Sequence, residues 1–72
     1  MTKVGMNTAA ERMVEANAKF VAVWFDKGNA YITDFGNDKD EVYNEGYFRW
    51  AMIHEYDGHF KVFPREEVEV LN

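Results

Sequence analysis

The dipeptide Asp57-Gly58 lies between two runs of strand-forming residues, Tyr47–Tyr56 and His59–Phe63. Tight two-residue hairpins prefer this dipeptide because both central positions of the turn need a positive φ. We therefore expect a β-hairpin here. Away from the turn, Trp50 is expected either in the hydrophobic core or, as an alternative, in a binding surface.

The length of the chain limits the size of that core. A chain of 72 residues forms one domain, and domains this small bury only about 60% of the surface that the unfolded chain exposes. Because the sequence has no cysteine, neither a disulfide framework nor a cysteine-based zinc site can compensate. Its six Phe, four Tyr and two Trp are the expected compensation, since each can bury roughly 150–250 Å².

The first half of the chain predicts one helix and two strands. Residues 1–7 show no periodicity, so we expect a flexible N-terminal tail. Thr8 and Glu11 match a capping box that opens a helix over Thr8–Lys19. The apolar run Phe20–Phe25 predicts a strand covered on both faces, and Ala30–Phe35 predicts its antiparallel partner after a turn that contains glycine.

The remaining segments complete an α+β fold. Residues 36–46 carry turn formers and charge, which favours an exposed loop, and residues 68–71 favour a last short strand after Pro64. The expected architecture for residues 1–72 is a single domain with an N-terminal helix packed on a small, mostly antiparallel sheet of four or five strands. An SH3-like or Sm-like small barrel is the alternative geometry.

The composition argues against most catalytic chemistries. Without Ser or Cys, nucleophilic triads built on these residues are excluded. His54 and His59 are one residue too far apart for the helical zinc motif, although a hairpin would place them on one face. The carboxylates between Asp38 and Glu45 lack the spacing and the central Gly of a calcium loop. We predict no enzyme, no cofactor and no metal site.

The charge and hydropathy favour a protein partner in the cytoplasm. The net charge of −5 disfavours direct binding to a phosphate backbone. No apolar run approaches the roughly 18 residues that span a bilayer, and the first residues lack the apolar region of a secretory signal. We therefore expect that the protein neither binds nucleic acid directly nor associates with a membrane.

The predicted partner-binding site combines acidic side chains with aromatic and Arg anchors. Tyr and Arg are enriched at the energetic centres of protein interfaces, and flanking acidic residues can steer a basic partner. The candidate residues are Asp38, Asp40, Glu41, Tyr43, Glu45, Tyr47 and Arg49.

The helix Thr8–Lys19, the aromatic strands and the acidic segment Gly36–Glu45 give the chain a resemblance to a group of phage proteins. These are small host-takeover proteins, which include regulators of bacterial RNA polymerase and anti-CRISPR proteins. The resemblance implies a phage-type inhibitor that acts in the host cytoplasm by occluding a host nucleic-acid enzyme or displacing a factor from it, with RNA polymerase the first choice. Two alternatives remain: an acidic DNA mimic that inhibits CRISPR or another nuclease, and a small-barrel domain that binds RNA or single strands.

Overall fold

The structure, a computed structural model of the chain, describes residues 1–54 and 59–71, with the backbone alone for residues 50, 53 and 54. It confirms the α+β class. The described residues contain two helices and five strands, and the strands form two open sheets and no closed barrel. In chain order the elements are β1 (Thr2–Gly5), α1 (Thr8–Ala16), β2 (Phe20–Asp26), β3 (Asn29–Gly36), α2 (Lys39–His54), β4 (His59–Pro64), the 3₁₀ turn η1 (Arg65–Glu67) and β5 (Val68–Leu71).

The predicted pair of strands β2 and β3 is confirmed, with β2 at the centre of the three-stranded antiparallel sheet β3-β2-β4. The turn between them uses Lys27 and Gly28, which both have positive φ (50° and 82°). This backbone suits the right-handed twist of the strands that it joins. Thr33 is an extra residue in β3, because Ala22 pairs with Asp34 while the neighbouring pair skips it, so it forms a β-bulge.

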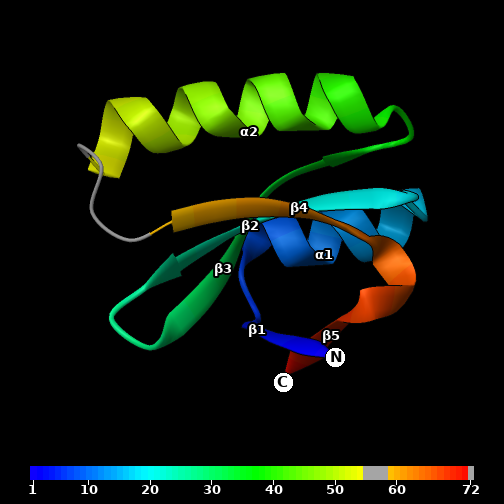
Figure 1. Ribbon diagram of the computed structural model, residues 1–72. Coiled ribbons are helices and arrows are strands. Elements are labelled where there is room, and N and C mark those ends of the chain that lie inside the picture. The colour runs from blue at the N-terminus through cyan, green and yellow to red at the C-terminus, as the bar shows by residue number, and fades with distance from the viewer. Residues whose placement is uncertain (55–58, 72) are drawn as a thin grey trace.

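The two faces of β2 pack against different helices, as its continuous apolar run predicts. Val21 and Val23 are fully buried in the main core, together with Met13 of α1. Ala22 and Trp24 alternate with them and therefore point to the opposite face, where α2 lies. Figure 1 shows this layering, with α2 across one face of the sheet and α1 across the other.

Helix α1 is shorter than predicted, and a different residue caps it. The Asn7 side chain, not that of Thr8, accepts a hydrogen bond from the Ala10 N–H at 2.7 Å. The helix ends at Ala16 because Asn17 adopts the left-handed conformation (φ 52°, ψ 46°). The expected helical stretch up to residue 19 therefore includes three residues that lie beyond the helix.

The segment expected to be a tail contains a strand. Thr2–Gly5 forms β1, which pairs in parallel with β5, and Val4 is fully buried in the same core as α1. The predicted last strand is thus confirmed as β5. Its partner was missed because the signal is not local: Thr2 pairs with Val68 at the other end of the sequence. The two ends of the chain meet at this small sheet (Figure 1).

The predicted loop over 36–46 and the strand after it are wrong, because the chain forms the 16-residue helix α2 there. Asp38 caps this helix. Its Oδ1 accepts the N–H groups of Asp40 and Glu41 at 3.0 and 3.1 Å, and its carbonyl accepts that of Val42 at 3.0 Å. Several backbone donors at the helix start are thereby satisfied by one residue.

The expected hairpin of Tyr47–Tyr56 with His59–Phe63 is wrong in its first strand and in its pairing, although its second strand is confirmed as β4 (His59–Pro64). β4 pairs with β2, where Trp24 lies opposite Phe60, and the chain before β4 is helical up to His54. The physical reason is that the face of β2 that carries Ala22 and Trp24 is apolar, and α2 removes this face from water. Asp57 and Gly58 lie outside the described residues, as does the side chain of Trp50, for which a core position and an interface position are the two expectations.

Candidate functional site

Gly46 determines how closely α2 approaches the sheet. A Cβ at this position would lie 2.7 Å from the Phe60 ring and 2.8 Å from the Ala22 Cβ, closer than two carbon atoms approach without strain. The backbone of α2 therefore rests almost directly on β2 and β4. This contact fixes which side of the helix faces the sheet and which side faces outward.

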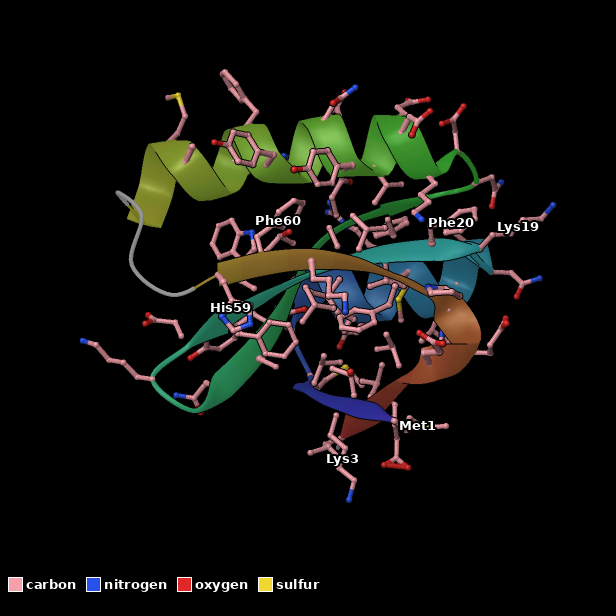
Figure 2. The ribbon with its side chains drawn as sticks, in the orientation of Figure 1. Met1, Lys3, Lys19, Phe20, His59 and Phe60 are labelled. Atoms are coloured by element: carbon pink, nitrogen blue, oxygen red, sulfur yellow. The ribbon has the colours of Figure 1, made fainter. Side chains whose placement is uncertain are left out.

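Two of the predicted anchors lie on the β4 side of α2 and contact the sheet. The ring of Tyr43 lies 5.4 Å from that of Phe60, and the ring of Tyr47 lies 6.2 Å from it in an edge-on arrangement. The two tyrosine rings stack 6.1 Å apart, one helical turn from each other. Figure 2 shows Phe60 pointing from β4 toward α2, with His59 on the other side of the strand. These tyrosines thus help to attach α2 while remaining partly exposed.

Arg49 lies on the opposite, β3 side of α2. Its guanidinium donates a hydrogen bond of 3.2 Å to the carbonyl of Thr33, the bulged residue of β3. Because β3 and β4 are at opposite edges of the sheet, Arg49 does not share a surface with the two tyrosines. The expected cluster of Arg and Tyr anchors is therefore divided between two sides of one helix.

The predicted acidic residues lie together at the start of α2. Asp38, Asp40, Glu41 and Glu45 are all exposed. Together with Asp34 of β3, three of them line a hollow of about 160 Å³ between the end of β3 and α2, whose lining contains no Lys or Arg. This end of the helix therefore carries concentrated negative charge.

Phe48 and Met52 lie further along α2 than the acidic residues, and they are not among the predicted site residues. Phe48 and Met52 have 63% and 67% of their surface exposed, although both are large and apolar. Glu41, Glu45, Phe48 and Met52 follow at i, i+4, i+7 and i+11, the spacing of one helix face. We call these four residues the outer stripe. The spacing was present in the sequence, but it could be recognised only once the segment was known to be helical.

The two histidines do not form the expected pair on a hairpin. His54 ends α2, and its side chain lies outside the described residues. His59 begins β4 and stacks on Phe25, with ring centroids 4.7 Å apart and planes at 14°. Across residues 1–54 and 59–71, no group of three or more His, Asp or Glu residues is arranged to hold a metal ion.

Neither α1 nor α2, over the part of the chain that the structure describes, is long and apolar enough to cross a membrane. Comparison with protein families, curated proteins and solved structures finds no match for this chain. The fold and the site define a small α+β protein with a three-stranded sheet between two helices. One of these helices exposes acidic residues at its start and apolar residues further along.

Proposed function

We propose that this chain is a non-enzymatic regulator that binds a protein through α2, and that its partner is a bacterial nucleic-acid enzyme, with RNA polymerase the first choice. The observation that supports this proposal most directly is the outer stripe. It places carboxylates and large exposed apolar side chains on one face of a helix that packs against the sheet through its buried residues Val42 and Gly46.

The charge of α2 supports a basic partner surface. Its first two turns and cap carry four carboxylates (Asp38, Asp40, Glu41, Glu45) and one cation (Lys39), a net charge of −3. Enzymes that act on nucleic acids bind phosphates with Lys and Arg, so they present the complementary charge. Opposite charge also accelerates association. Binding there would regulate the enzyme by occluding its nucleic acid or by displacing a factor.

The acidic hollow favours one second candidate, an inhibitor that imitates DNA and blocks CRISPR or another nuclease. That function would need the carboxylates around Asp34 and Asp38 but not Phe48 or Met52. The RNA-binding alternative has less support, because Arg49 and the tyrosines lie on opposite sides of α2 and could not act together on one strand of bases.

The test is a titration of purified bacterial RNA polymerase with the full chain, read as binding and as transcription in vitro. The variant Asp40→Asn/Glu41→Gln/Glu45→Gln removes three charges from α2 and leaves the Asp38 cap intact. The control Glu15→Gln/Glu66→Gln/Glu67→Gln removes three charges from exposed positions of α1 and η1. Both variants have the same net charge.

We expect the α2 variant to bind at least about tenfold more weakly at low salt, and the control to bind within about twofold of the unaltered chain. Equal losses in both variants would mean that overall charge, and not α2, mediates binding. No binding by the unaltered chain would exclude RNA polymerase, and a nuclease inhibition assay would then test the second candidate.

A further inference from the structure

We infer that the segment of the partner that docks on this protein is an amphipathic helix lying lengthwise along the outer stripe. Its Lys and Arg side chains lie against Glu41 and Glu45, and its apolar side chains lie against Phe48 and Met52. The inference deepens the proposed function and rests on it, because it specifies the form and chemistry of the protein partner.

The shape of the stripe favours a helix as its occupant. The four residues extend over eleven steps of α2, from Glu41 to Met52, which at 1.5 Å per residue is a ridge of about 16.5 Å. Rows of side chains spaced in this way pack into the grooves of a second helix laid at a small angle.

The order of residues along the stripe defines the chemistry of that helix. The two glutamates occupy the N-terminal part of the stripe, and Phe48 and Met52 occupy the C-terminal part. A matching helix therefore has its cations toward one end of its contacting face and its apolar side chains toward the other. The apolar part would supply most of the affinity, because binding would remove the exposed surface of Phe48 and Met52 from water.

The same order disfavours a pairing in which the outer stripes of two copies of this chain contact each other. The stripe has no Lys or Arg. In an antiparallel pairing of two copies, Glu41 and Glu45 would lie against Phe48 and Met52 of the second copy, which would desolvate charges without a partner. In a parallel pairing, carboxylates would face carboxylates, which is repulsive. The charge pattern therefore selects a different, basic protein.

The test uses purified RNA polymerase and two matched variants of the full chain. Phe48→Ala/Met52→Ala removes the apolar half of the stripe. Met6→Ala/Val14→Ala removes two side chains of similar exposure, 45% and 51%, before and on α1. We expect the stripe variant to bind at least about tenfold more weakly and the control within about twofold. Urea unfolding should show that both variants fold, since all four side chains are exposed.

A photo-crosslinking amino acid, p-benzoylphenylalanine, at position 48 then identifies the docked segment by mass spectrometry. We expect a crosslink to a helical segment of the polymerase that carries apolar residues and, about two turns away on the same face, Lys or Arg. Unchanged affinity of the stripe variant, or a crosslink to a strand of the polymerase, would overturn the inference while leaving the proposed function standing. A crosslink to a nucleic acid or to a second copy of this chain would overturn the inference and would also count against the polymerase as the partner bound through α2. Failure of the unaltered chain to bind would overturn both.

Discussion

The replacement Gly46→Ala tests how α2 is attached to the sheet, because two opposing effects act at this position. In an exposed helix, Ala is more favourable than Gly by about 1 kcal/mol. Here the added methyl would lie 2.7 Å from the Phe60 ring and 2.8 Å from the Ala22 Cβ. An ordinary carbon–carbon contact is about 3.5–4.0 Å, so a gap of about 1 Å has to open.

The neighbours of Gly46 determine which effect is larger. The Cβ of Ala22 is attached directly to the backbone of the central strand, so it cannot move without moving β2. The Phe60 ring is held by Tyr43 and Tyr47 and cannot rotate freely. Overpacking costs about 1–3 kcal/mol, and two neighbours that cannot move place the cost in the upper half of this range, above the gain in helix propensity of about 1 kcal/mol. We expect a net loss of about 1–2 kcal/mol in the free energy of unfolding.

Urea unfolding measures this loss as a lower midpoint at an unchanged slope. A double-mutant cycle with Ala22→Gly provides the control, because removing the Ala22 methyl makes room for the new one. The second substitution should recover about 1 kcal/mol relative to the sum of the single changes. An increase in stability of about 1 kcal/mol for Gly46→Ala alone would refute the close contact between α2 and β2.

Two further predictions concern elements that the sequence did not reveal. Asp38→Ala should lower the free energy of unfolding by about 1 kcal/mol, and Asp38→Asn should lower it by much less, because Asn can still accept the hydrogen bonds at the start of α2. Urea titrations in which the Ala and Asn variants have the same stability would show that Asp38 is not an effective cap. Val4→Ala should cost about 2 kcal/mol, since Val4 is fully buried, and the amides of β1 should be protected from hydrogen exchange. A tail that does not pack on the core would give no change in stability and no protection.

The elements that could be predicted are those whose signals are local. The apolar run of β2 and the turn at Lys27-Gly28 define a hairpin without knowledge of the rest of the chain. β1 could not be found in this way, because it is stabilised by β5 at the far end of the sequence and by burial of Val4. Its own residues show no pattern.

Helix α2 was missed because its local signals conflict. Tyr47 and Phe48 favour strands, and Gly46 disfavours a helix interior. The packing of α2 against β2 outweighs these preferences, and Gly46 is what allows that packing. The pair Asp38 and Glu41, three residues apart, was a usable capping signal.

The missed helix also explains why the candidate site was only partly predicted. All seven predicted residues lie on α2 or at its cap, but the expected loop and strand could not indicate which of these residues share one face of a helix. Only the helical period places Glu41 and Glu45 in line with Phe48 and Met52, and only the contacts with the sheet separate Arg49 from this stripe.

The pairing of β1 with β5 also affects how the protein responds to mechanical force. The two strands are parallel and adjacent, with Thr2 opposite Val68 and Gly5 opposite Leu71. A pull that separates the N-terminal end of β1 from the C-terminal end of β5 therefore acts along the strands, in opposite directions. It loads the hydrogen bonds between them in shear, all together, instead of opening them one after another. When the chain is held by both ends, this short sheet shields the core and α2 from the load until its bonds break as a unit.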